Sequence, residues 1–152
     1  MPGFTLTETV AAPVPAVFAA FTDFENAANR VTDIIRVEVL TPGPVGVGTR
    51  FKETRKMFGK ETTETMTVTA FEPEKLIELS AGSCGAEFTT RFTFAPVGAG
   101  TAVGVELRTR AVSLAAKLFT PLAYLMMGTI KKCVARDVAQ IRASVEAAAR
   151  AA

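Results

Sequence analysis

Six segments between residues 34 and 110 have the composition and spacing of β-strands, and one long helical pattern follows them. Residues 4–10 alternate with a period of two and predict a further strand near the start of the chain. The connection at 42–48 is rich in glycine and proline, and the later breaks are five residues or shorter. Short breaks favour an antiparallel meander, because parallel strands need long crossovers. The six strands are expected at 34–40, 49–58, 61–71, 75–81, 86–95 and 101–110.

After residue 112 the apolar side chains recur every three or four residues for some thirty residues. Pro121 fits only in the first turn of a helix, so the main helix is expected to begin near Thr120. Two short helices are expected between Pro15 and Arg30. A helix of about thirty residues is about 45 Å long, and its available partner is the curved sheet. The 152 residues therefore predict one α+β domain, in which seven antiparallel strands wrap around the last helix.

The chain has no histidine, which excludes Ser–His nucleophiles and most catalytic zinc sites. Its serines have no base, so no catalytic residue is predicted. Cys84 and Cys133 match no metal or redox spacing, and free thiols indicate a cytoplasmic protein. The glycines at 44–49 precede no Lys–Ser/Thr pair, and the basic residues are scattered. No metal, cofactor or nucleic acid is therefore expected.

Charge is distributed unevenly along the chain. Residues 1–107 carry 9 basic and 13 acidic groups, a net charge of −4, whereas residues 108–152 carry 8 and 2, a net charge of +6. The basic segment either complements the acidic sheet or contacts anionic lipid. The apolar stretch at 118–130 is too short to span a bilayer, and the first residues lack the pattern of a signal peptide.

The hairpin around Gly59 is expected to place charged side chains on the inward face of the sheet. A two-residue turn at Gly59 and Lys60 predicts a register and a set of inward pairs. Charges on an otherwise apolar face indicate a hollow interior, where Arg55 would bind a polar group of a ligand. Alternatively, the hairpin extends past the helix and the charges form an exposed salt bridge. The inward pairs are Phe51 with Val68, Glu53 with Met66, and Arg55 with Glu64, and Arg55 is held by Glu53 or Glu64.

The strands at 86–95 and 101–110 are also expected to have one inward face and one solvent-exposed face. Closing this hairpin with Phe94 opposite Thr101 makes one face apolar and leaves charges on the other face, which is expected in solvent. The apolar face joins the inward side of the sheet. Its pairs are Phe88 with Leu107, Thr90 with Val105, and Phe92 with Val103.

Residues 118–130 are apolar on nearly every side of the predicted helix. A helix on a solid sheet needs one apolar stripe, so the extra apolar residues indicate a pocket, a lipid surface or a partner. Met126 adapts to irregular contents, and Tyr124 can donate its hydroxyl to a ligand. Alternatively, the short helices and loops bury this stretch.

Several segments resemble the START-like helix-grip superfamily, and within it the bacterial polyketide cyclase/dehydrase (SRPBCC) group. They are AAPVPAVFAAFTD at 11–23, PVGVGTRF at 44–51, FEPEKLIEL at 71–79, GAGT at 98–101 and the long final helix. The resemblance covers essentially the whole chain. It implies a bent antiparallel sheet that grips the last helix around a deep apolar cavity, with Phe51 at a position where relatives often carry a cavity-facing aromatic. Such domains bind lipids, hormones or polyketides, and some catalyse reactions.

The leading hypothesis is a protein that encloses a small hydrophobic or amphipathic ligand, with Arg55 and Tyr124 as polar anchors. A second hypothesis is a cyclase or dehydratase in which Glu64 moves a proton. A third is a lipid carrier that contacts membranes through Lys117, Lys131, Lys132 and Arg136. The expected lining is Phe51, Met66, Val68, Phe88, Phe92, Val105, Leu107, Leu122, Leu125, Met126 and Thr129.

Overall fold

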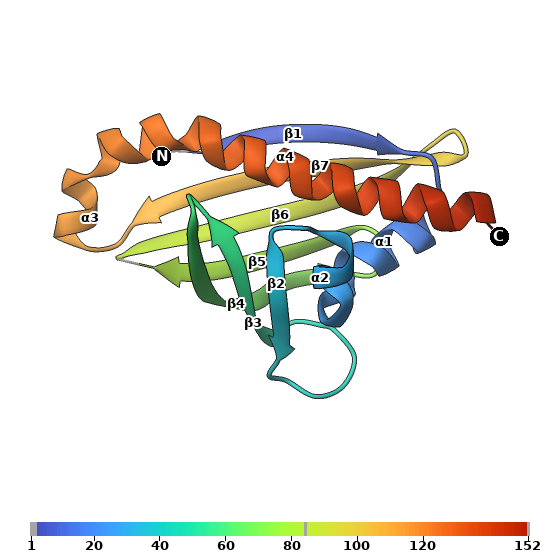
Figure 1. Cartoon of the computed structure of the whole chain (residues 1–152), viewed down its shortest axis with the longest axis horizontal. Coiled ribbons are helices and arrows are strands. Elements are labelled where there is room, and N and C mark those ends of the chain that lie inside the picture. Colours follow the sequence, from blue (N-terminus) through green and yellow to red (C-terminus); the bar gives the residue numbers. More distant parts are fainter. Residues whose placement is uncertain (1–2, 84, 152) are drawn as a thin grey trace.

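The computed structural model describes residues 3–83 and 85–151, and Cys84 lies outside this range. The described chain forms one seven-stranded sheet crossed by a long C-terminal helix (Figure 1). The strands are β1 (Gly3–Val10), β2 (Ile34–Val39), β3 (Arg50–Met57), β4 (Lys60–Glu72), β5 (Leu76–Ser83), β6 (Ala86–Val97) and β7 (Gly100–Ala111). The helical segments are α1 (Val14–Thr22), the 3-10 turn η1 (Phe24–Asn26), α2 (Ala27–Arg30), α3 (Leu114–Leu118) and α4 (Thr120–Ala151).

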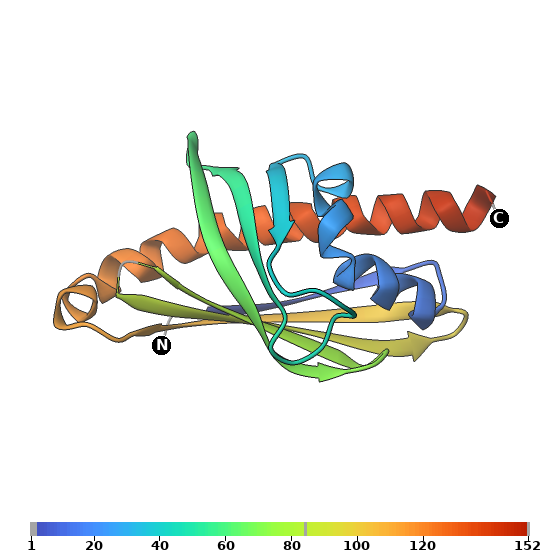
Figure 2. The same ribbon diagram turned by 90° about the horizontal axis from the view of Figure 1, so that it is seen from below.

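The sheet is antiparallel throughout, in the order β1-β7-β6-β5-β4-β3-β2. Strands β2 to β7 follow one another as a meander, and β1 pairs with β7 at the far edge. Figure 2 shows β3 and β4 turned steeply out of the plane of β5–β7 toward α4. The sheet thus curves around the helix, which confirms the expected α+β helix-grip architecture.

The turn between β3 and β4 differs from the sequence prediction. Its two central residues are Phe58 and Gly59, with φ of 54° and 75°, and Met57 pairs with Lys60. Two consecutive positive φ values are typical of a type I′ turn, whereas the prediction assumed a type II′ turn one residue later. The predicted register is therefore wrong by two residues. Because side chains alternate with a period of two, the inward face is unchanged.

That shift changes which residues lie opposite each other on the inward face. Glu53 pairs with Glu64 instead of Met66, and Arg55 pairs with Thr62 instead of Glu64. Phe51 pairs with Met66 rather than Val68. Two carboxylates thus lie on directly opposite positions of neighbouring strands.

The β6–β7 hairpin has the same two-residue error. Both strands continue to a tight turn at Gly98 and Ala99, where Gly98 has a φ of 59°. Pro96 and Val97, expected in the loop, belong to β6, since proline is tolerated at a strand end. The observed pairs are Phe92 with Val105, Thr90 with Leu107 and Phe88 with Thr109.

The short helices close one end of the molecule. Pro15 lies in the first turn of α1, and Phe18 and Phe21 of that helix are buried. The ring of Phe18 meets that of Phe94 edge-on, with centroids 5.1 Å apart, and Phe21 meets Phe92 at 5.7 Å. This aromatic cluster makes the end around α1 a solid core.

Polar contacts fix the C-terminal part of α4 across the molecule. Arg136 forms an ion pair with Asp33, and Arg142 with Glu8 of β1. Gln140 Nε2 donates to Thr32 Oγ1 at 2.8 Å. In the described chain, no helix is long and apolar enough to cross a membrane.

Candidate functional site: a cavity between the sheet and α4

A cavity of about 440 Å³ lies between the inward face of the sheet and α4. Alternation along the strands turns inward-facing residues toward it, and the short helices and the residue after α2 contribute Phe21, Phe24 and Val31. Most of the lining is apolar, which is typical of sites for small molecules. The strand residues that line it include Phe51, Met66, Phe88, Thr90, Phe92 and Leu107, and those of α4 include Ala123, Met126, Met127, Ile130, Val134 and Ile141.

A charged cluster lies in the wall of this apolar cavity. Arg55 Nη2 of β3 donates to Asp137 Oδ2 of α4 at 2.6 Å, and Arg55 Nε lies 3.6 Å from Glu53 Oε2. The side chains of Arg55, Glu53 and Asp137 are all less than a fifth exposed. Buried charges are stable only when they are paired, so the Arg55–Asp137 contact ties the bent part of the sheet to the helix.

Burial dominates the protonation of this cluster. It raises the pKa of Glu53 against the lowering effect of Arg55, and the charges of Asp137 and Glu64 raise that pKa further. Burial likewise raises the pKa of Asp137, although Arg55 opposes the rise. Burial lowers the pKa of Arg55, but Glu53 and Asp137 outweigh it and the net direction is upward. Across the described residues, no three metal-binding side chains converge to hold a metal ion.

The structure brings eight of the proposed site residues around the cavity, and their part in binding stays a prediction. Val68 and Val105 also face inward, but they are 1% and 2% exposed and pack in the solid core instead of the lining. Both belong to the buried cluster that also contains Phe18, Phe21 and Phe94. The residues around the cavity are Phe51, Arg55, Glu64, Met66, Phe88, Phe92, Leu107 and Met126.

The four remaining proposed residues lie on the outer side of α4. Leu125 is 80% exposed and Tyr124 55% exposed, and Leu122 and Thr129 are exposed as well. They lie outside the cavity because the helix turns the smaller Ala123 and the flexible Met126 inward. Tyr124 therefore lies outside the lining that contains Arg55, and its expected place as a second polar anchor inside the cavity is not what the structure shows.

Sequence reasoning missed Asp137, the partner of Arg55. Its position was readable from the helical period, because residues 130, 134, 137 and 141 follow the spacing of one helix face. A carboxylate on that face indicates a partner inside the molecule. The contribution of Phe24 was also missed, although its ring stacks on Phe51 with centroids 4.1 Å apart.

A curved antiparallel sheet, a long helix across it and a cavity between them define a helix-grip domain. The family model for polyketide cyclase/dehydrase and lipid transport matches residues 1–150. The chain therefore belongs to this family. No curated protein sequence matches it significantly.

Solved structures of related shape cover nearly the whole chain. The aromatase/cyclase ZhuI from Streptomyces sp. R1128 has a TM-score of 0.74 and 19% identity, over 95% of this chain and 93% of that one. Ara h 8.0201 has a TM-score of 0.75 and 16% identity, over 94% and 96%. A START superfamily protein from Mycobacterium smegmatis has a TM-score of 0.73 and 17% identity, over 95% and 97%. At these identities the likeness shows a shared fold alone.

Proposed function

We propose that this protein binds a small, mainly apolar molecule in the cavity between the sheet and α4. The observation that carries the proposal is the cavity itself, about 440 Å³ and lined mostly by apolar side chains. Water in such a space has few partners, so an apolar molecule that displaces it gains free energy. Membership of a family that includes lipid transport supports the same function.

A fluorescence titration with N-phenyl-1-naphthylamine, a neutral apolar probe, tests this proposal. The wild-type protein is expected to bind the probe with one saturable site. Ala123 lines the cavity, so Ala123→Phe fills the space that the probe needs and is expected to weaken binding at least tenfold. Ala135 is exposed on the same helix, so Ala135→Phe is the matched control and should bind like the wild type.

Circular dichroism and thermal unfolding show whether each variant is folded. Equal probe affinity in folded Ala123→Phe and Ala135→Phe would place the probe outside the cavity and contradict the proposal. Absence of saturable binding to the wild-type protein would contradict it as well.

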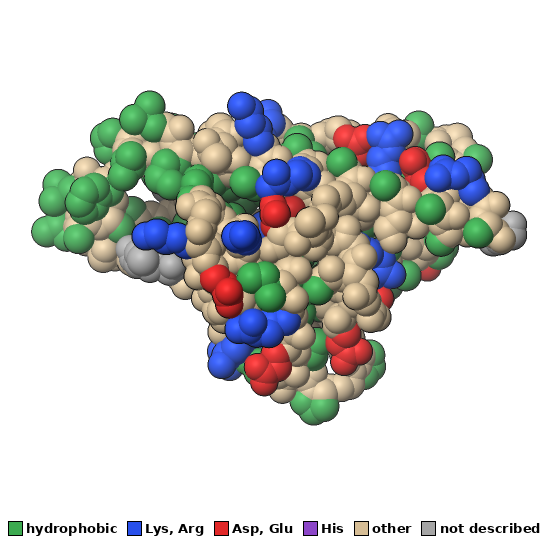
Figure 3. Space-filling model, viewed as in Figure 1, with side chains coloured by type: hydrophobic (Ala, Val, Ile, Leu, Met, Phe, Trp, Pro, Cys, Tyr) green, Lys and Arg blue, Asp and Glu red, His purple; other side chains and the backbone are tan. Residues whose placement is uncertain are grey.

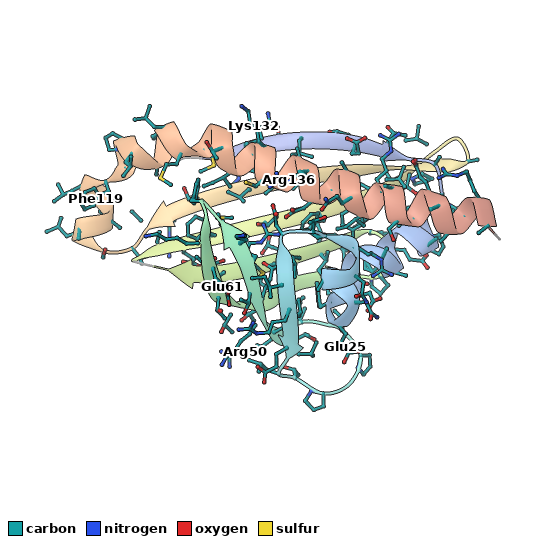
Figure 4. All side chains as sticks on the ribbon, in the orientation of Figure 1. Glu25, Arg50, Glu61, Phe119, Lys132 and Arg136 are labelled. Atoms are coloured by element: carbon teal, nitrogen blue, oxygen red, sulfur yellow. The ribbon has the colours of Figure 1, made fainter. Side chains whose placement is uncertain are left out.

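We also propose a second function, contact with an anionic membrane surface. The apolar patch on α3 and the first turns of α4 consists of Leu114, Leu118, Phe119, Leu122 and Leu125, all more than half exposed. Figure 3 shows hydrophobic side chains gathered over α3 and the first turns of α4, and Figure 4 shows Phe119 pointing away from the sheet.

The charges beside the apolar patch favour an anionic lipid surface as its partner. Lys117, Lys131 and Lys132 are exposed, and among the described residues none of them has an ion-pair partner. Basic residues around exposed apolar side chains are typical of segments that lie in a lipid headgroup layer.

Co-sedimentation with vesicles tests this second proposal. Binding is expected to vesicles that contain phosphatidylglycerol and to be much weaker with phosphatidylcholine alone. Leu118→Gln should reduce binding severalfold, whereas Val47→Gln, at an exposed valine of the β2–β3 connection, should not. Equal binding to both kinds of vesicle would contradict the electrostatic part, and an unaffected Leu118→Gln would exclude the patch.

A further inference from the structure

Among the described residues, each arginine that lines the cavity already has a carboxylate partner. Arg55 donates to Asp137 at 2.6 Å. Arg30 Nη1 lies 3.0 Å from an oxygen of Asp23. Arg110 Nη2, at the end of the cavity next to α3, lies 3.1 Å from Glu87 Oε2. An anionic head group that enters the cavity therefore meets no arginine whose charge is free.

Two carboxylates of the wall, Glu53 and Glu64, are less well partnered than these arginines. Glu64 faces the cavity and has neither an ion pair nor a hydrogen bond among the described residues. It lies opposite Glu53 on the neighbouring strand, and like charges in opposite positions destabilise a sheet. Glu53 in turn has only the 3.6 Å contact with Arg55 Nε, which is too long for a good hydrogen bond.

Two buried atoms of the same cluster have no hydrogen-bond partner, Arg55 Nε and Asp137 Oδ1. An unpartnered buried polar atom costs free energy that a ligand can recover by supplying the missing partner. The open acceptors are Asp137 Oδ1 and the carboxylates of Glu53 and Glu64, and the one cation among them, Arg55, already donates to Asp137. With all four groups ionised, three carboxylates and one guanidinium give this cluster a charge of −2.

We propose that the cavity selects apolar ligands whose head group donates hydrogen bonds and carries no negative charge, an ammonium or a hydroxyl, over carboxylates of the same chain length. This inference rests on the proposed ligand-binding function and names the class of ligand. An ammonium supplies up to three donors and a positive charge, and a hydroxyl supplies one donor, which matches the open acceptors and the negative charge of this cluster. A carboxylate would be desolvated beside three others, and Arg55 is already occupied by Asp137.

Three matched compounds test the proposal: decylamine, decan-1-ol and decanoic acid, each used at pH 7 to displace N-phenyl-1-naphthylamine from the wild-type protein. The amine and the alcohol are expected to displace the probe with dissociation constants at least tenfold below that of the acid. An acid that binds as tightly as the amine, or failure of all three to displace the bound probe, would overturn the proposal. Failure of the probe itself to bind would instead overturn the underlying function.

Two variants assign the selectivity to this cluster. Glu64→Gln removes the charge of the open carboxylate and should reduce the preference for the amine over the acid at least threefold. Glu61→Gln is the matched control, because Glu61 is exposed on the same strand (Figure 4) and should leave the preference unchanged. Equal preferences in the two variants would exclude Glu64.

Asp137→Asn tests the ion pair between Arg55 and Asp137. It removes the negative partner of the guanidinium, so decanoic acid should bind more tightly than it does to the wild type. If this variant does not fold, the Glu64→Gln comparison still decides the proposal, since Glu64 has no partner whose loss would destabilise the protein. A folded Asp137→Asn protein that still rejects the acid would show that the pairing of Arg55 does not set the selectivity.

Discussion

The two halves of α4 have different relations to the rest of the molecule. Residues 133–151 bury Val138 and Val145 and are tied to the body by the Arg136 and Arg142 ion pairs. In residues 120–132, Met127 is the single buried side chain, and Leu125 is 80% exposed.

Both halves line the cavity, the C-terminal half through residues such as Val134 and Ile141, but the difference separates a firmly held part of the helix from a loosely held one. The C-terminal half fixes the helix across the sheet. The N-terminal half turns Ala123, Met126 and Met127 over the cavity, and flexible methionines can adapt to ligands of different shape. A cover with few fixed contacts opens more easily than a packed core.

The largest difference in stability is expected between two variants that place the same charge in the two halves of α4. Val138→Asp buries a carboxylate without a partner and next to Asp137, so we expect the free energy of unfolding to fall by about 3–5 kcal/mol. Leu125→Asp introduces the same charge at an exposed site and should change stability by less than about 0.5 kcal/mol. Urea unfolding measures both, and similar losses would contradict the division of the helix.

A smaller effect should appear in the pH dependence of stability. Because the pKa of Asp137 is raised by burial, the folded state binds this proton more tightly than the unfolded state. The stability contributed by that proton is complete below about pH 4 and is lost as the pH rises through the folded-state pKa. Asp137→Asn should therefore gain stability relative to the wild type as the pH rises from 4 to 7.

Asp23 provides a control of opposite sign. Burial raises its pKa, but hydrogen bonds from Asn26 and Arg30 outweigh burial and the net direction is downward. Its contribution to stability is complete above the ordinary aspartate pKa of about 4 and is lost as the pH falls below it, so Asp23→Asn should lose stability relative to the wild type as the pH rises from about 2 to 5. Urea unfolding between about pH 2 and 7 compares the three proteins, and parallel curves would show that neither carboxylate has the stated environment.

The smallest effect concerns Gly128 in the exposed half of α4. A Cβ at this position meets no atom within 4 Å, and alanine favours a helix over glycine by about 1 kcal/mol. Gly128→Ala should therefore stabilise the protein by about this amount and leave probe affinity unchanged. Gly100→Ala is the contrasting variant, because its Cβ would lie 2.7 Å from the backbone oxygen of Val10 and should destabilise β7. Thermal unfolding distinguishes them, and a destabilised Gly128→Ala would show that this half is packed after all.

The sequence was sufficient for the order of the strands and of the helices other than the short α3, because period-two alternation and short breaks leave few topologies. It was not sufficient for hairpin register. The position of a tight turn depends on which residues accept positive φ, and Phe58 does so although its side chain disfavours it. Both predicted registers were shifted by two residues, so the faces of β3 and β6 were still assigned correctly.

The wall of the cavity was predictable on the strands and less so on the helix. A strand residue such as Phe88 has two possible directions, and alternation decides between them. A helical stretch that is apolar on all sides does not reveal which side faces the sheet. Leu122 and Leu125 could therefore not be distinguished from Ala123 and Met126. The partner of Arg55 had a readable signal in the helical spacing of Asp137, whereas its distance to Arg55 depends on the bend of the sheet.

Chemical-shift mapping of ¹⁵N-labelled protein titrated with decan-1-ol tests the central claim most directly, because it separates the cavity from the exposed apolar patch. We predict that the largest shifts fall on amides around the cavity, such as those of Phe88, Ala123 and Met126. Shifts confined to Leu114 and Leu118 on the outer surface would contradict the account.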